Sequence, residues 1–74
     1  MARTLKYTPE NLMKGRDVEV LQERLALLGY SCGEVDGIFS EKVDHAVRAF
    51  QHDNELPTTG EADDTTFFVI GLKH

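Results

Sequence analysis

The sequence predicts an all-α fold, a small three-helix bundle with long ordered loops. Apolar residues recur at helical spacing in two segments, from about Arg16 to Leu28 and from about Glu41 to Asn54. A glycine-containing loop joins these segments, and a shorter third helix is expected after Asp63. With 74 residues, 41% of them apolar, the chain fits one small globular domain with a modest core.

The first helix is expected to bury one apolar stripe and to end at Gly29, which can adopt a left-handed conformation. The stripe consists of Val18, Leu21, Leu25 and Leu28. Val20 and Leu27 lie off this stripe and need another partner. Either the N-terminal arm covers them through Leu5 and Tyr7, or they form a surface that docks onto a missing domain.

The second helix is expected to begin at Ser40 as its N-cap and to bury a narrower stripe. That stripe consists of Val43, Ala46, Val47 and Phe50. Turn residues follow at Pro57 and Gly60, and Asp63 is expected to cap the third helix. The segment "TTFFVIG" has high strand propensity, so the cap and the lack of a pairing partner are what favour a helix there.

The charge pattern excludes several classes of partner. A net charge of -5, from 13 acidic and 8 basic residues, provides no cation excess for a phosphate backbone, so no nucleic acid is expected. A helix-turn-helix protein is disfavoured because the second helix carries only Lys42 and Arg48 as fixed cations. No apolar run approaches the roughly 20 residues that span a bilayer, and the N-terminus lacks the apolar stretch of a signal peptide. No membrane partner is expected.

Reactive side chains are sparse. Cys32 is the single cysteine, which excludes an intramolecular disulfide and a thiolate cluster, and a packing role is favoured over a nucleophilic one. His45 and His52 lie two helical turns apart, too far to bind one ion without a third group. No acid/base pair has credible spacing. We therefore expect no catalytic residue, no metal and no cofactor, and an independent enzyme is disfavoured.

Three blocks of sequence carry a family resemblance: "KGRDVEVLQERLALLGY", "VDGIFSEKVDHAVRAFQ" and "LPTTGEADDTT". In this order they resemble the bacterial peptidoglycan-binding domain, a three-helix module also called PG-binding type 1. Order and spacing agree from Leu12 to about Ile70, so we expect an N-terminal arm over residues 1–11 and a peptidoglycan-binding-like domain over residues 12–74. The chain departs from the family pattern at Val43, where Thr is favoured, and in the bulkier residues 67–69.

The resemblance implies a non-catalytic cell-wall-binding module that targets a linked hydrolase or endolysin to the wall. Its expected partners are peptidoglycan, through a glycan strand or stem peptide, and a tethered catalytic domain. It implies a location in the cell envelope or outside the cell (periplasm or cell wall), or in a phage endolysin acting on the wall. The alternative is a protein–protein interaction or regulatory domain, because the same fold serves as a propeptide in matrix metalloproteinases. The cysteine-switch motif "PRCGxPD" of that propeptide is missing, since Cys32 lies in "YSCGEVDG".

The resemblance also implies a shallow ligand groove beside the loop that joins the first two helices. The candidate ligand-binding residues are Tyr30, Asp36, Gly37, Phe39, Asp44, Arg48 and Gln51. Tyr30 and Arg48 are needed by no cap or turn, and an aromatic ring with a guanidinium suits a sugar and a carboxylate.

Most of the other candidates also have an expected structural role. Gly37 is expected to adopt a positive φ, Asp36 to bond back to loop amides, and Phe39 to fill the gap between the helices. The side-chain amides of Gln22 and Gln51 are expected to satisfy backbone groups of loops and helix ends.

Overall fold

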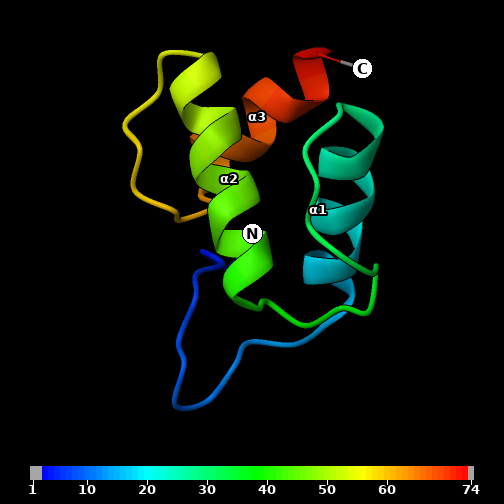
Figure 1. Ribbon diagram of the computed structural model, residues 1–74. Helices are drawn as coiled ribbons and strands as arrows, with labels where there is room; N and C mark the ends of the chain where they lie inside the picture. Colours follow the sequence, from blue (N-terminus) through cyan, green and yellow to red (C-terminus); the bar gives the residue numbers. More distant parts are fainter. Residues whose placement is uncertain (1–2, 74) are drawn as a thin grey trace.

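The computed structural model describes residues 3–73 (Figure 1). In this part of the chain an N-terminal arm precedes three helices, which are joined by two long loops. The helices are α1 (Arg16–Leu27), α2 (Glu41–Asp53) and α3 (Asp64–Lys73). Helix α1 packs against both α2 and α3. Within residues 3–73 no strand forms beyond two isolated β-bridges, and no helix there has the length and apolarity to cross a membrane. The all-α prediction is confirmed.

The core lies between the helices and is built from the two predicted stripes. Its largest buried apolar side chains include Val18, Leu21 and Leu25 of α1 together with Val43, Val47 and Phe50 of α2. Leu28 is only partly buried because α1 has ended before it. Val43, which replaces the family's Thr, is fully buried, so its methyl groups contribute to the core where a hydroxyl would need a partner.

Helices α1 and α2 end in the same way, with a left-handed residue just past the helix. After α1, Gly29 has φ 94° and the N–H of Tyr30 donates to the carbonyl of Leu25 at 2.8 Å. After α2, the N–H of Leu56 donates to the carbonyl of Gln51 at 2.8 Å. Both are Schellman motifs, which satisfy carbonyl groups left free at a helix end. The residue at φ 60° in the second motif is Glu55, a non-glycine residue.

The two predicted N-caps have different outcomes. Asp63 accepts the backbone N–H of Thr66 through Oδ1 at 2.9 Å, so the cap of α3 is confirmed and outweighs the strand propensity of the residues after it. Ser40 is the N-cap residue of α2, as predicted, with extended backbone angles (φ -91°, ψ 178°), but its side chain makes no capping hydrogen bond. Glu41 and Asp44 in the first turn of α2 supply negative charge at this helix end instead.

The N-terminal arm joins the core through Leu5. The backbones of Leu5 and Ala62 pair in both directions, with N···O distances of 3.2 and 2.7 Å, and the Leu5 side chain is fully buried. Leu27 stays 78% exposed, so the prediction that the arm covers it is wrong. Pairing with Ala62 fixes Leu5 between the helices and leaves it unable to reach the outer face of α1.

Candidate functional site

The loop between α1 and α2 is held by the side chain of Gln22, which is only 1% exposed. Its Nε2 donates to Oδ1 of Asp36 at 3.0 Å and to the carbonyl of Ile38 at 3.1 Å. Its Oε1 accepts the backbone N–H of Gly37 at 2.8 Å. The predicted structural role of Gln22 is confirmed: one amide on α1 fixes three consecutive loop residues.

Three candidate residues of this loop serve its shape. Asp36 accepts the N–H of Ile38 through Oδ1 at 3.0 Å, and Gly37 has φ 75°, both as predicted. The hydrogen bond from Gln22, followed by the one from the Ile38 N–H, lowers the pKa of the Asp36 carboxyl. Phe39 is fully buried, so its ring fills the core and a ligand on the surface does not reach it.

The loop between α2 and α3 is held in the same manner by Gln51. Its Oε1 accepts the backbone N–H groups of Thr59 at 3.0 Å and Gly60 at 2.9 Å. Its Nε2 donates to the carbonyl of Glu61 at 2.9 Å and to Oγ1 of Thr66 at 3.1 Å. The side chain is 1% exposed, so Gln51 positions the loop and leaves no polar atom free for a ligand.

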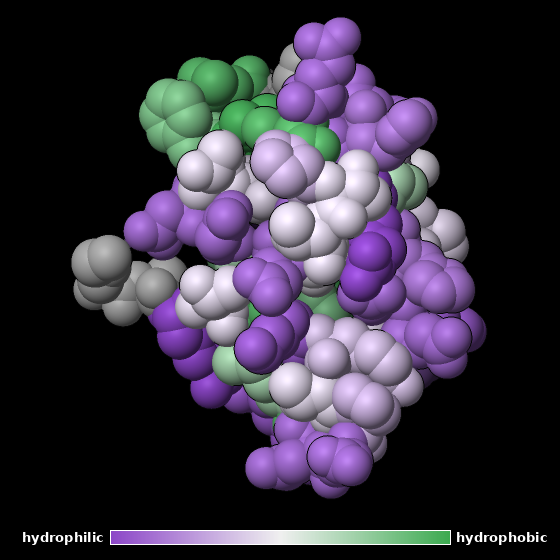
Figure 2. Space-filling view, turned by 90° about the vertical axis from the view of Figure 1, so that its left-hand side faces the viewer, coloured by the Kyte–Doolittle hydropathy of each residue, from purple (hydrophilic) through white to green (hydrophobic). Residues whose placement is uncertain are grey.

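Arg48 and Asp44 form an ion pair on the outer side of α2. Arg48 Nε donates to Asp44 Oδ2 at 3.1 Å, and Nη1 donates to the carbonyl of Thr58 at 3.4 Å. A Cβ built on Gly60 would lie 2.8 Å from Arg48 Nε. The expectation that no turn uses Arg48 is therefore wrong, because its guanidinium reaches the α2–α3 loop. Figure 2 shows the face of this loop, which is mostly hydrophilic, with apolar surface gathered at its upper end on the side of α3.

Tyr30 lies on the other flank of α2. Its hydroxyl donates to Oδ2 of Asp53 at 2.8 Å, and its ring meets Phe50 edge-on at 5.6 Å between centroids. Desolvation, with a smaller effect of Asp53, raises the pKa of Tyr30. At about 100° per residue, Asp53 lies about 140° around α2 from Arg48. The structure thus does not bring Tyr30 and Arg48 together into one site.

The candidate residues are spread over separate hollows. Tyr30 and Asp53 line one of 280 Å³, whereas Asp36 and Gly37 line another of 440 Å³. Gln51 borders a third, of 140 Å³, beside Pro57. No single groove of the described residues contains the predicted set.

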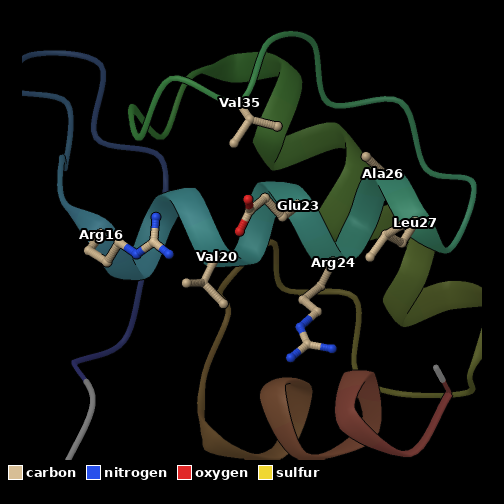
Figure 3. A pocket seen from close by; sticks show the side chains of 7 residues that line it. All are labelled: Arg16, Val20, Glu23, Arg24, Ala26, Leu27 and Val35. Carbon is tan, nitrogen blue, oxygen red and sulfur yellow. The ribbon is translucent and has the colours of Figure 1, made fainter.

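A larger groove, of 620 Å³, runs along the outer face of α1, where a docking surface was one of the two alternatives that the sequence left open for Val20 and Leu27 (Figure 3). It is lined by Arg16, Val20, Glu23, Arg24, Ala26, Leu27 and Val35. Figure 3 shows Val35 on the α1–α2 loop beside one side of α1, while Arg24 extends from the other side of the helix towards α3. The signal in the sequence was the pair of apolar residues off the α1 stripe, Val20 and Leu27.

Reactive groups provide no further site in the described part of the chain. Cys32 is buried and its thiol donates to the carbonyl of Gln22 at 3.4 Å. Desolvation raises the pKa of the Cys32 thiol, which makes it a poor nucleophile. Among residues 3–73, no group of three or more His, Cys, Asp or Glu residues is placed to hold a metal ion.

The comparisons with known proteins agree on one family. A family profile described as "Putative peptidoglycan binding domain" matches residues 14–69. Among curated proteins, no sequence matches the chain significantly. Among solved structures, the SleB N-terminal domain shares 31% identity at a TM-score of 0.86, over 96% of this chain and 92% of that one.

In two further solved structures the similarity covers one part of a longer protein. A fused Zn-dependent amidase/peptidase/peptidoglycan-binding protein of Clostridium acetobutylicum shares 28% identity at a TM-score of 0.82 over 95% of this chain. The Burkholderia AP3 phage endolysin shares 28% identity at a TM-score of 0.84 over 97% of this chain. The chain spans 29% and 26% of the length of these two proteins.

Proposed function

Because the chain belongs to the peptidoglycan-binding domain family, we propose that it is a non-catalytic module that holds a linked wall hydrolase or endolysin on peptidoglycan. The observation that carries this proposal is the family match over residues 14–69, which includes all of α1 and α2. Structural likeness to an endolysin and to a fused amidase supports the link to a hydrolase. The site of action would be the cell envelope or the wall outside the cell.

The use of polar side chains in the structure supports a binding role over a catalytic one. The buried amides of Gln22 and Gln51 are engaged by loop backbone groups. The Asp36 carboxylate accepts two hydrogen bonds that lower its pKa, whereas a general acid needs a pKa near the working pH. These groups stabilise loops and are poorly suited to proton transfer.

Binding by this module should be weak and local. The chain carries a net charge of -5, and peptidoglycan stem peptides also carry carboxylates, so long-range attraction does not assist the encounter. A weak contact is sufficient when it holds a tethered catalytic domain at the wall, because tethering raises the local concentration of that domain.

Sedimentation with purified, protein-free sacculi tests the proposal. The domain should pellet with sacculi and stay in the supernatant with chitin, a polysaccharide that lacks stem peptides. The isolated domain should also release no soluble fragments from dye-labelled sacculi. A folded domain that stays in the supernatant with sacculi would contradict wall binding and favour the protein-interaction alternative, and dye release would contradict the non-catalytic role.

A further inference from the structure

We propose that the groove on the outer face of α1 binds a peptidoglycan stem peptide, with the Arg24 guanidinium paired to a free carboxylate of that peptide. Leu27 and Val20 would contact the short aliphatic side chains of the same peptide. This inference rests on the wall-binding function proposed above and adds to it a surface and a part of the ligand. Neither Tyr30 nor Arg48 belongs to this groove.

Helical geometry puts the groove opposite the core. At about 100° per residue, Arg16, Val20, Glu23 and Leu27 fall within an arc of about 60°, and Arg24 lies about 40° beyond the edge of that arc. The centre of that arc lies about 160° from the buried stripe of α1. The distance along the axis from Arg16 to Leu27 is about 16 Å at 1.5 Å per residue. An extended peptide of four or five residues has a similar length, about 13–17 Å.

The apolar part of the groove is exposed without a covering element among the described residues. Leu27 is 78% exposed and Val35, on the facing loop, is 41% exposed. Single exposed apolar residues are common on protein surfaces, but here they border one groove together with Val20 and Ala26 (Figure 3). These side chains supply contacts for methyl groups, such as those of the alanines in a stem peptide.

Arg24 is the charged group of the groove that can take an anionic ligand, although Glu23 also lines the groove and the whole chain is acidic. Three arginines pair with carboxylates: Arg3 with Asp17, Arg16 with Glu19, and Arg48 with Asp44. Within residues 3–73, no carboxylate forms an ion pair with Arg24. A guanidinium is a planar fork that matches a carboxylate in two parallel hydrogen bonds. Among the arginines of the described residues, Arg24 is therefore the one that a peptide carboxylate can engage without breaking an ion pair.

The groove suits the peptide better than the glycan. None of its lining residues is aromatic, whereas a sugar ring commonly packs on an aromatic face, for which Tyr30 would be the candidate in a separate hollow. The lining combines aliphatic side chains with the guanidinium groups of Arg16 and Arg24 and the carboxylate of Glu23, and Arg16 is already paired with Glu19. A short peptide with a free carboxylate for Arg24 and methyl side chains for Val20 and Leu27 complements this lining.

Sacculus retention of matched variants tests the inference. Arg24→Gln should lower retention at least about fivefold, as expected for loss of a hydrogen-bonded charge pair. Lys42→Gln removes the same charge from an exposed position on α2 and should leave retention within about twofold of wild type. Both variants should keep the wild-type melting temperature. Amidation of the free carboxylates of the sacculi should reduce wild-type retention to the Arg24→Gln level and leave that variant unchanged.

Amide chemical shifts recorded with a soluble stem peptide give the location independently. The peptide should shift the amide signals of Val20, Arg24 and Leu27, and a glycan fragment without peptide should not shift them.

The outcomes separate this inference from the proposed function. If the wild type and Arg24→Gln pellet equally with sacculi, the groove is not the site and wall binding stands. If the wild type does not pellet, the proposed function itself fails. Shifts centred on Tyr30 or Arg48 would overturn the assignment to α1. Shifts of groove residues on dilution without peptide would overturn it in favour of a second copy of the chain.

Discussion

The side-chain oxygen of Gln22 accepts the backbone N–H of Gly37 at 2.8 Å across 15 positions of sequence. Gln51 does the same for Gly60, at 2.9 Å across 9 positions. Each long loop is thus fixed by an amide that projects from the preceding helix. A loop outside regular secondary structure obtains partners for its backbone N–H and C=O groups in this way.

Replacing Gln22 by methionine should destabilise the domain by about 2 kcal/mol or more. Methionine keeps the length of the side chain but leaves the Gly37 N–H and the Ile38 carbonyl without their partner, and unsatisfied buried groups cost about 1–3 kcal/mol each. Urea unfolding followed by circular dichroism measures the change. Glu23→Met, at the neighbouring exposed position, should stay within about 0.5 kcal/mol; equal losses for the two variants would contradict the role given to Gln22.

Gly37→Ala should cost more stability than Gly29→Ala. Both glycines have positive φ, 75° and 94°, so each alanine carries backbone strain of about 1 kcal/mol. A Cβ on Gly37 would in addition lie 3.2 Å from the carbonyl oxygen of Gly15, whereas nothing lies within 4 Å at Gly29. Gly37→Val should be worse still, because the side chain is branched at Cβ. Melting temperatures should fall in the order Gly29→Ala, Gly37→Ala, Gly37→Val. A higher melting temperature for Gly37→Ala than for Gly29→Ala would contradict a destabilising contact with the Gly15 carbonyl oxygen.

Glu55→Gly should stabilise the domain by about 0.5–1 kcal/mol. Glu55 has φ 60° in the Schellman motif after α2, a conformation that strains a side chain and suits glycine. Glu55→Ala is the control, because it removes the charge but keeps Cβ and should bring no comparable gain. Chemical denaturation distinguishes the two, and a similar gain in both variants would point to charge rather than backbone strain.

Leu5→Ala should cost about 2–5 kcal/mol, the range found when a large buried aliphatic side chain is truncated. Leu5 is fully buried although it lies in the arm, 11 positions before the first residue of α1. Leu72→Ala provides the matched control, since Leu72 is 66% exposed on α3. Thermal unfolding of the two variants should show a large loss for the first and almost none for the second.

The Asp36 carboxyl should titrate below the ordinary aspartate value of 3.8. A pKa that is lowered by folding adds stability above 3.8 and loses it as the pH falls through the lower folded-state value. Asp36→Asn, which keeps an oxygen acceptor without the proton equilibrium, should therefore lose less stability than wild type between about pH 4 and pH 2. Carboxyl carbon chemical shifts give the pKa directly, and parallel acid-unfolding curves would contradict the prediction.

The helices and the loop geometry could be predicted because they depend on local rules. Apolar periodicity gave the buried stripes of α1 and α2, and a positive φ at Gly37 followed from glycine in a tight reversal. The bonding of Gln22 and Gln51 to backbone groups also followed from a general requirement, that buried polar groups find partners.

Features that depend on distant contacts could not be predicted in the same way. The burial of Leu5 requires a partner, Ala62, in another loop, and the sequence carries no sign of that pairing. The engagement of Arg48 by Thr58 depends on the path of the α2–α3 loop. The positions of Val20 and Leu27 in the sequence indicated a surface on α1. The other side of the groove is formed by Val35, which belongs to a loop whose position depends on the tertiary fold.

The burial of Leu5 also determines where the domain can be cut and fused to another protein. The family profile covers residues 14–69, but Leu5 and Ile70 are both buried in the core outside those limits. A graft cut at the family boundaries would remove two core side chains and expose the apolar surfaces that they cover. The portable unit therefore extends at least from Leu5 to Ile70, and a fusion junction should be made outside it.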